Sequence, residues 1–358
     1  MNKIGILTFH GVLNHGAVLQ AYALNKFLNC NGADSEVINY SPWYFAWQVH
    51  RPAKGFSKSI LKFKRILKFR RFERNHLNIS KVKYRNLSSL SNLKYDALVC
   101  GSDQVWNKEI TKGEIDKAYL LDFPFNGKRF SYAASSGANR IAKEIGVVKA
   151  LSHFDGLAVR EVGLCNELQD AGLNVRHVAD PTFLIDSDEY EEIIYSDLLP
   201  NNSYIVSYEV STDETRKKYS EAVCKLKKKF ALPVVHIGDK VLECADVNLL
   251  NISTNDWIAL ISNSNMVVTN SFHGCSFGIK FKKPLVVLSH LDDNRNARPL
   301  SLLSTLGMRD CFYDVSNNEV DEIPAGYMTI KRDYDKYDRF VYESKKYALE
   351  MIRQASEN

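Results

Sequence analysis

The residues best suited to chemistry in this chain lie in the hexapeptide TNSFHG at residues 269–274. Residues 265–270 have the pattern of a short apolar strand, and residues 271–281 have that of the helix that follows it. The first turn of a helix carries N–H groups without intrahelical acceptors and the positive end of the helix dipole, so it can hold an anion. His273 in this turn could bind the anion when protonated or pass a proton to it. The alternative is a histidine that only packs or caps locally.

A second candidate region joins a strand at residues 3–9 to a helix at residues 17–30. The loop between them contains Asn14, His15 and Gly16, with a further glycine upstream. Glycines there would let a ligand approach the backbone N–H groups closely. The spacing matches neither a dinucleotide-binding loop nor a Walker-type phosphate loop. A tight turn without a ligand is the alternative.

An arginine lies near the end of another predicted strand, residues 156–161. Because a planar guanidinium can form two parallel hydrogen bonds, Arg160 could clamp a phosphate or a carboxylate. The alternative is an ion pair with Glu161 or with another acid.

Polar residues also lie at the ends of two further strands. Ser102 and Asp103 follow the strand at residues 96–101, and Asp180 ends the strand at residues 175–180. These side chains could orient a sugar hydroxyl or act as a base. For Asp180, which precedes a proline, a turn-capping role is favoured.

Three more side chains are candidates for ligand binding. Trp106 could stack on the face of a sugar ring, although a tryptophan more often fills a core. Arg295 and Arg298 follow the last predicted strand and could reach a ligand at its end. Exposed surface positions are the alternative for both arginines.

Alternating strands and helices would position all these residues. The polar stretch 186–203 interrupts the alternation and is the natural boundary between domains. The sequence therefore predicts an α/β protein with two doubly wound domains, residues 1–190 and 200–330, and ligands at the carboxyl ends of the strands. Residues 331–358 include a helix expected to pack back on the first domain. The predicted strands are short and apolar, as in buried parallel sheets: 3–9, 36–40, 96–101, 129–135, 156–161, 175–180, 204–210, 233–238, 265–270 and 284–289.

A series of motifs extends over residues 3–310. It comprises NHGAVLQAYAL (14–24), VINYSP (37–42), LVCGSDQVWN (98–107), SYAASSG (131–137), VREVG (159–163), VADPTFL (178–184), NSFHG (270–274) and NARPLSLLSTLGM (296–308). In content and order these motifs resemble those of the polysaccharide pyruvyl transferases. The resemblance implies two Rossmann-like domains facing across a cleft, a GT-B-like architecture, with the acceptor on the N-terminal side and the donor on the C-terminal side.

The same resemblance implies a reaction. A pyruvyl group would move from phosphoenolpyruvate to a sugar of a polysaccharide precursor, giving a pyruvate ketal and free phosphate. His273 would be the proton donor, Arg160 the anion clamp and Asp103 a candidate base. No cofactor and no metal-binding residue is expected, and the metal dependence of the reaction is left open. The expected substrate-binding residues are Asn14, His15, Gly16, Ser102, Trp106, Asn270, Ser271, Phe272, Gly274, Arg295 and Arg298.

Two alternatives remain open at this point. A nucleotide-sugar-dependent glycosyltransferase of the same architecture would use the same helix end for a diphosphate. A non-catalytic glycan-binding or scaffold protein would need a site for a sugar, but would not need His273 together with Arg160.

The composition is that of a globular protein, with 358 residues of which 45% are hydrophobic and 11% aromatic. No apolar run of 18 residues occurs and the first strand begins at once, so we expect neither a membrane-spanning helix nor a secretory signal. Seven scattered cysteines without CxxC spacing favour reduced thiols over structural zinc or an iron–sulfur cluster. The expected location is therefore the cytoplasm.

Positive charge is concentrated in residues 51–74, which hold ten Lys or Arg and one acid in a chain of net charge +5. Phe56, Ile60, Phe63 and Leu67 recur at helical spacing, so the segment reads as an amphipathic basic helix. It could lie on the inner membrane face, where a polyprenyl-diphosphate-linked acceptor would be found, or grip a diphosphate. A helix packed by this apolar stripe is the alternative. Nucleic acid is not an expected partner, since no recognised binding module accompanies the patch.

Overall fold

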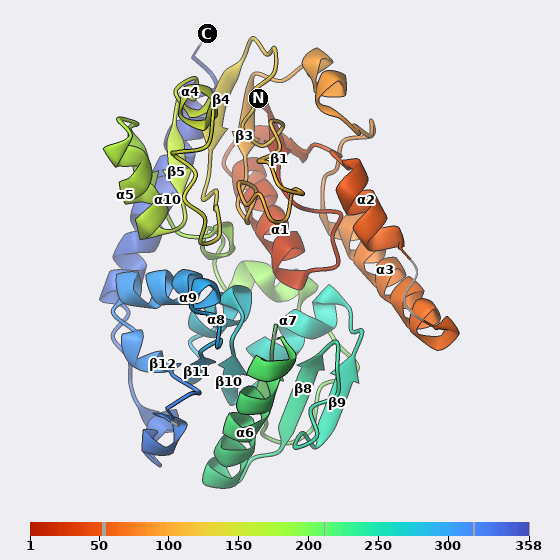
Figure 1. The fold of residues 1–358 in the computed structure, drawn as a ribbon, viewed down its shortest axis with the longest axis vertical. Helices are drawn as coiled ribbons and strands as arrows, with labels where there is room; N and C mark the ends of the chain where they lie inside the picture. The colour runs from red at the N-terminus through yellow and green to blue at the C-terminus, as the bar shows by residue number, and fades with distance from the viewer. Residues whose placement is uncertain (52–54, 211, 318, 358) are drawn as a thin grey trace. The chain divides into compact units, whose positions relative to one another are not determined.

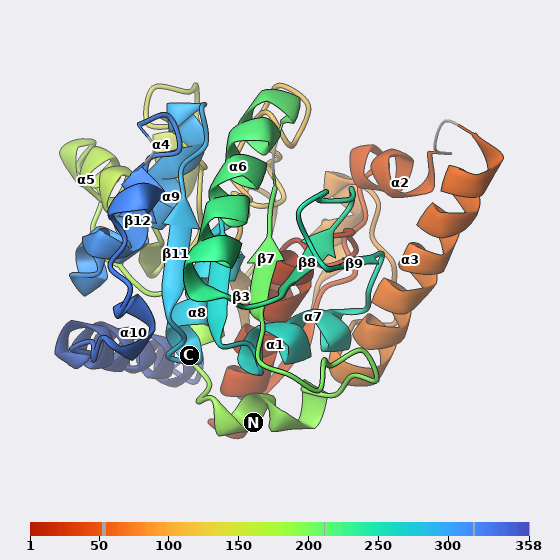
Figure 2. The same ribbon diagram turned by 90° about the horizontal axis from the view of Figure 1, so that it is seen from below.

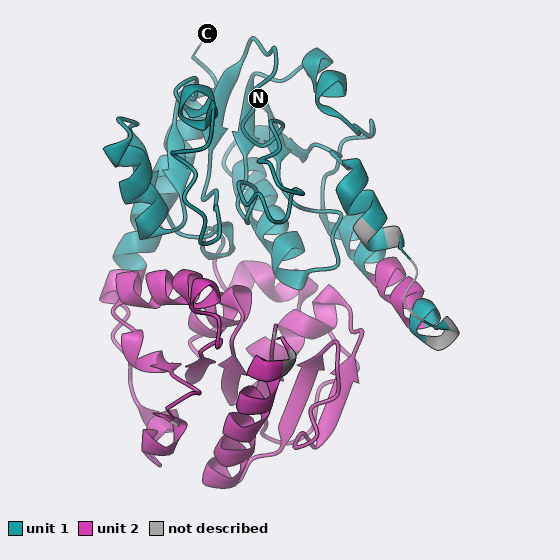
Figure 3. Ribbon diagram, in the orientation of Figure 1, with its two compact units in different colours: residues 1–60, 69–185, 338–358 teal, residues 61–68, 186–337 magenta. Residues whose placement is uncertain are grey.

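The computed structural model (Figures 1 and 2) describes residues 1–51, 55–210, 212–317 and 319–357. The chain divides into two compact units, coloured separately in Figure 3. Unit 1 comprises Met1–Ile60, Phe69–Ile185 and Asp338–Asn358, and unit 2 comprises Leu61–Lys68 and Asp186–Tyr337. The C-terminal segment therefore belongs to unit 1, and the main part of unit 2 begins with the polar stretch 186–203.

Unit 1 is built on a parallel sheet with the strand order β2-β1-β3-β4. Its strands are β1 (Asn2–Leu7), β2 (Ala33–Val37), β3 (Ala97–Cys100) and β4 (Lys128–Ser131). A second parallel pair, β5 (Leu157–Val159) with β6 (Val175–His177), continues from β4 through isolated bridges such as Phe130 with Gly156. All four residues of β3 are buried, as expected for a strand that is covered on both faces.

The helices of unit 1 follow local capping rules. In α1, Asn14 caps the first turn by accepting hydrogen bonds from the N–H groups of Gly16 and Ala17. The chain leaves this helix at Gly32, whose φ of 90° suits a residue without a Cβ. The helices are α1 (His15–Cys30), α2 (Trp43–His50), α4 (Val147–Leu151), α5 (Val162–Asp170), the two ends of α3 (Phe56–His76) and most of α10 (Asp335–Gln354).

Unit 2 has a parallel sheet of the order β12-β11-β10-β7-β8-β9. Its strands are β7 (Ile205–Tyr208), β8 (Val234–Gly238), β9 (Val247–Leu250), β10 (Met266–Thr269), β11 (Leu285–Leu288) and β12 (Phe312–Tyr313). The helices that connect them are α6 (Asp213–Phe230), α7 (Thr254–Ser262), α8 (Phe272–Lys280) and α9 (Asp293–Leu306). Both sheets are parallel with helical connections, so the predicted doubly wound α/β class is confirmed.

Each sheet has one point at which the strand order reverses. In unit 1 the chain moves outward from β1 to β2 on one side and then to β3 on the other. In unit 2 it moves from β7 through β8 to β9, and then returns to β10 beside β7. Ligands of open α/β sheets bind outside the carboxyl ends of the two strands at such a point. The expected ligand positions are therefore the carboxyl ends of β1 and β3 in unit 1 and of β7 and β10 in unit 2.

Two strands of the described residues are missing from the sequence prediction, which covers the other ten. The unpredicted strands are β9 and β12, which lie at the two edges of the sheet of unit 2. Strand β9 is only partly buried and β12 has two residues, so neither shows the continuous apolar run of a central strand. Among the helices, the sequence prediction includes α1, α3, α8 and α10 and has no bounds for the others. Helix α2 has the aromatic sequence WYFAWQVH, which shows only a weak helical pattern.

The core of unit 2 allows a test of the fold. Phe277 on α8 is fully buried, and its ring contacts those of Tyr190, Trp257 and Phe281. Phe277→Ala should lower the free energy of unfolding by about 3–5 kcal/mol, because it leaves a cavity in a packed core. Urea unfolding would measure this. The matched control is Phe63→Ala on α3, whose exposed ring should contribute less than about 0.5 kcal/mol. Equal effects would contradict this description of the core.

Candidate functional site

The turn from β10 into α8 is tied to the neighbouring strand of unit 2. The Thr269 hydroxyl donates to the Tyr208 carbonyl at 2.7 Å and accepts from the Ser271 N–H at 3.0 Å. The Asn270 side chain accepts from the Val210 N–H at 2.8 Å. These bonds join the carboxyl ends of β7 and β10, which is the point where the strand order reverses.

Helix α8 begins directly above this turn. Ser271 is its N-cap and its hydroxyl accepts from the Gly274 N–H at 3.5 Å. A Cβ at position 274 would overlap the Thr269 hydroxyl, so glycine is required for this close approach of helix to strand. His273 is the second residue of the helix and is buried. The imidazole is therefore held within the turn that favours anions.

A second histidine, His290, belongs to the same cluster, although the sequence analysis does not single it out. Its Nε2 lies 3.0 Å from the Asn270 carbonyl oxygen, and since a carbonyl can only accept, Nε2 carries the proton. The Asn296 side chain holds the His290 backbone through bonds of 2.7 and 2.9 Å. The sequence feature that could have identified His290 is its position directly after the predicted strand at residues 284–289.

Burial lowers the pKa of His290 from 6.5 to about 4. The bond to the Asn270 carbonyl opposes this shift, and the positive charges of Arg295 and Arg298 add to it. His290 is therefore neutral at physiological pH, beside a helix end that favours anions. Both arginines lie on α9, where Arg295 is exposed and pairs with Asp292 at 3.7 Å and Arg298 is half-buried.

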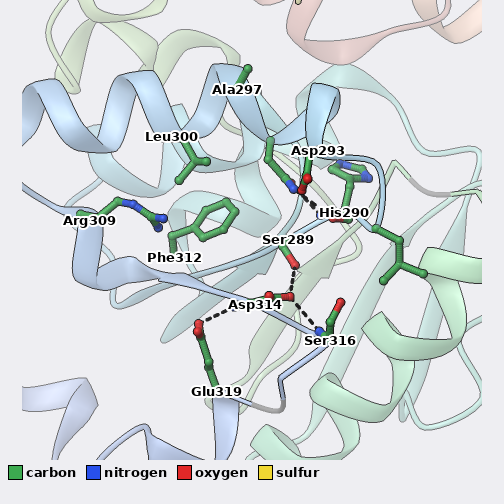
Figure 4. A pocket seen from close by; sticks show the side chains of 12 residues that line it. Ser289, His290, Asp293, Ala297, Leu300, Arg309, Phe312, Asp314, Ser316 and Glu319 are labelled. Carbon is green, nitrogen blue, oxygen red and sulfur yellow. Dashed lines mark hydrogen bonds between the residues drawn. The ribbon is translucent and has the colours of Figure 1, made fainter.

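Figure 4 shows a pocket of about 380 Å³ in unit 2 beside α9 and the ends of β11 and β12. Two of its carboxylates, those of Asp314 and Glu319, are engaged with the protein. Asp314 accepts from the Ser289 hydroxyl at 3.0 Å and from the Ser316 N–H at 2.8 Å. The Glu319 side chain accepts from the Asp314 N–H at 2.6 Å. These bonds order the loop, and the pocket lining includes neither His273 nor the two arginines of α9.

A buried carboxylate follows β7, where the sequence analysis did not place a candidate. Glu209 forms an ion pair with Arg216, and its Oε1 lies 3.9 Å from Nε2 of His236. Burial, with the nearby charge of Arg216, lowers the pKa of His236 to about 4. The cluster is thus a carboxylate neutralised by arginine beside a neutral histidine. An acid at the carboxyl end of a predicted strand was the signal for Glu209.

In unit 1, the ends of β1 and β3 are joined by hydrogen bonds. The Thr8 hydroxyl donates to the Ser102 carbonyl at 2.7 Å and accepts from the Gln20 side chain at 2.9 Å. Asn14 caps α1, as described, and Gly16 is buried in its first turn. His15 is also buried, with its ring stacked on Phe69 at 4.7 Å.

Arg160 is buried in unit 1 among carboxylates. Its Nη1 lies 2.7 Å from Asp180, and its Nε lies 3.2 Å from Glu161. The Ser102 hydroxyl donates to the same Asp180 oxygen at 2.9 Å, while Asp180 also caps the following turn through Thr182. Burial alone would lower the pKa of Arg160, but the negative charges of Glu161 and Asp180 outweigh it and raise the pKa. The ion-pair alternative is therefore present in the structure.

Asp103 and Trp106 follow Ser102 in a buried loop. Asp103 has a φ of 77°, and its carboxylate accepts from the Gln104 N–H at 2.9 Å. Trp106 is fully buried, and its indole N–H donates to the Tyr119 carbonyl at 2.9 Å. Full burial favours the core alternative for Trp106 over sugar stacking, because none of its ring is exposed.

The structure thus gathers the predicted residues into two groups. In unit 1, Ser102 and Arg160 meet through Asp180 at the end of β3. In unit 2, residues 270–274 surround the start of α8, with His290 as an added member. Among the described residues, no group of three or more His, Cys, Asp or Glu side chains could hold a metal ion.

Solved structures of other proteins have this architecture. The UDP-GlcNAc 2-epimerase from Methanocaldococcus jannaschii is 12% identical over 100% of both chains, with a TM-score of 0.58. The enzyme of that name from Neisseria meningitidis bound to UDP-GlcNAc is 12% identical over 99% of this chain and 100% of that one, with a TM-score of 0.55. UGT89C1 from Arabidopsis thaliana complexed with quercetin is 11% identical over 99% of both chains, with a TM-score of 0.50. These likenesses define a protein of the GT-B fold.

The family follows from the sequence itself. The model of the polysaccharide pyruvyl transferase family matches residues 14–293, which is most of the chain. The protein therefore belongs to this family of transferases, as its motifs predicted. No curated protein sequence matches it.

The buried network of Arg160 yields a stability prediction. Arg160→Met leaves the carboxylates of Asp180 and Glu161 buried without their cation, so it should cost about 3–5 kcal/mol of unfolding free energy. The matched control is Arg176→Met, which removes the exposed pair with Glu350 and should cost about 0–1 kcal/mol. Urea unfolding of both variants is the measurement, and a cost below about 1 kcal/mol for Arg160→Met would contradict the network.

His290 yields a pH prediction. The unfolded chain takes up a proton at this histidine near pH 6.5, whereas the folded protein does so only near pH 4. The stability from the neutral ring is therefore complete above pH 6.5 and declines as the pH falls toward 4. Between pH 7 and pH 5, His290→Gln should lose about 2 kcal/mol less stability than the wild type. Equal losses in urea unfolding at the two pH values would contradict a buried neutral His290.

Proposed function

We propose that this protein transfers a pyruvyl group from phosphoenolpyruvate to a sugar of a polysaccharide precursor, forming a pyruvate ketal and releasing phosphate. The observation that supports this most is the position of His273 in the first turn of α8, above the point where the strand order of unit 2 reverses. Membership of the family supports this reaction. The positive end of the α8 dipole has the right charge for a carboxylate or phosphate.

The chemistry assigns a task to each group. His273 donates a proton to the methylene carbon of phosphoenolpyruvate, which becomes a methyl group, and positive charge develops on the neighbouring carbon. One sugar hydroxyl adds to that carbon and loses its proton. The phosphate then leaves with its bridging oxygen. The second hydroxyl attacks the same carbon and gives its proton to the departing phosphate, which closes the ketal. The positive end of the α8 dipole stabilises the negative charge of the donor.

The proposed roles of Arg160 and Asp103 now have a structural context. Arg160 is already paired with Asp180 and Glu161. Direct clamping of the donor remains a prediction for Arg160, and we favour a positioning role in which it orders Ser102 at the end of β3. Asp103 remains a candidate base for the sugar hydroxyl. Asn14, His15, Gly16, Arg295 and Arg298 remain candidate contacts for the two substrates.

The second candidate is transfer of a sugar from a nucleotide-sugar donor. The observation in its favour is the shared fold with the Neisseria meningitidis enzyme bound to UDP-GlcNAc. In that case the start of α8 would hold the diphosphate of the donor. A non-catalytic glycan-binding protein is the third alternative, and it would release neither phosphate nor nucleotide.

Replacement of His273 tests the proposal. With phosphoenolpyruvate and an acceptor panel containing galactose, mannose and N-acetylmannosamine, the wild type should release inorganic phosphate. His273→Gln should lower this rate about 10²–10⁴-fold, the usual contribution of a positioned proton donor. The matched control is His153→Gln, which changes an exposed histidine of unit 1 and should leave the rate unaltered.

The outcomes separate the candidates. Nucleotide release from UDP-sugars without phosphate release from phosphoenolpyruvate would favour the glycosyltransferase. A normal rate in a folded His273→Gln protein would assign His273 to packing.

A further inference from the structure

Helix α3 packs by a face other than the apolar stripe of Phe56, Ile60, Phe63 and Leu67. Ile66, Phe69 and Phe72 are buried, and the rings of Phe69 and Phe72 contact His15 and Tyr22 of α1. The predicted apolar stripe faces outward instead: Ile60, Phe63 and Leu67 are 40%, 58% and 49% exposed. Phe56, the remaining residue of that stripe, has a side chain outside the described residues. The stripe therefore does not serve as the packing face of this helix.

Cations continue the same outward face toward the end of the helix. Lys64, Arg71 and Arg74 are exposed. Positions three, four and seven residues apart lie on one side of an α-helix, so these three share the face of Phe63 and Leu67. The outward face of α3 thus begins with large apolar side chains and ends with positive charges.

Other cations of α3 are used to hold the helix in place. The segment Leu61–Lys68 is grouped with unit 2. Within it Arg65 forms an ion pair with Asp239, and the Lys68 ammonium donates to the Asn251 carbonyl at 3.0 Å. These two side chains have structural partners, which leaves the outward face as the part of the helix suited to an external partner.

The preceding helix adds two exposed indoles. Trp43 and Trp47 of α2 are 68% and 51% exposed and lie four residues apart, on one side of the helix. Cations accompany Trp47, with the Arg51 guanidinium 4.9 Å and the Lys112 ammonium 5.4 Å from its ring centre. Tryptophans with apolar bodies and polar edges are enriched where proteins meet the lipid headgroups.

We propose that the outward faces of α2 and α3 bind the surface of an anionic lipid bilayer. Apolar side chains enter the headgroup boundary while the cations of α3 contact acidic headgroups, as in other interfacial amphipathic helices. Among the described residues, no helix is both long and apolar enough to cross a bilayer. Nucleic acid would attract the cations but offers no apolar layer to Phe63, Leu67 and the indoles. The proposal does not depend on the reaction that the protein catalyses.

Sedimentation with vesicles tests this surface. The full chain should bind vesicles of phosphatidylcholine with about one third phosphatidylglycerol and should not bind phosphatidylcholine alone, since acidic headgroups attract nearby cations. Binding should disappear at about 1 M salt, where the Debye length is about 3 Å. Binding should also shift tryptophan fluorescence to shorter wavelength. Trp106 and Trp257 are already buried, so the shift would report Trp43 and Trp47.

Variants locate the contact. The triple variant Lys64→Gln, Arg71→Gln and Arg74→Gln should weaken vesicle binding about a hundredfold at low salt, at about fivefold per cation. The matched control removes three exposed lysines elsewhere: Lys81→Gln, Lys217→Gln and Lys228→Gln. This control has the same net charge as the α3 triple variant, but it should bind vesicles like the wild type. Phe63→Ser with Leu67→Ser should reduce binding without lowering the urea midpoint, because both side chains are exposed.

Several results would overturn the proposal. Equal loss of binding in the two triple variants would make the attraction a property of net charge and not of this surface. Equal binding to neutral and anionic vesicles would show that the cations do not contribute to binding. Binding to an RNA homopolymer that exceeds vesicle binding and depends on Lys64, Arg71 and Arg74 would assign the face to nucleic acid.

Discussion

The candidate site depends on how closely helix α8 approaches strand β10. The helix can begin directly after the strand only because position 274 has no side chain, since a Cβ there would occupy the place of the Thr269 hydroxyl. That hydroxyl in turn bonds to the Tyr208 carbonyl and the Ser271 N–H, so it joins two strands and the helix start. The position of His273 is therefore a consequence of backbone packing. A shift of this turn would move the imidazole and the helix dipole together.

The polar interior of the two units follows one electrostatic rule, that a buried charge is retained with a partner. Arg160 lies between Asp180 and Glu161 in unit 1, and Glu209 is paired with Arg216 in unit 2. A buried histidine without a carboxylate of its own remains neutral, because burial lowers its pKa. His290 is the example. The ends of the strands therefore combine fixed ion pairs, which order the loops, with uncharged rings. Such a preorganised setting suits proton transfer to a bound anion.

Helix α3 shows the limit of an argument from amphipathic patterns. Its sequence contains two apolar series, one with Phe63 and Leu67 and the other with Ile66, Phe69 and Phe72. Either series could have been the packing face from its spacing alone. The side chains of α1 select the second, because His15 and Tyr22 offer aromatic contacts to Phe69 and Phe72. The first series is then left on the outside beside a row of cations.

The sequence by itself determined the fold class, the family and the start of α8, because apolar runs, capping residues and motifs are local signals. It located ten of the strands but not β9 and β12, which are short or partly exposed at the sheet edges and so lack an apolar run. Only the tertiary structure decided that Trp106 belongs to the core, that Arg160 meets Asp180, and that His290 joins the turn before α8. Those pairings link residues that are distant in sequence, and the order in which strands assemble brings them together. The spacing of residues along the chain does not reveal the order of the strands in the sheet.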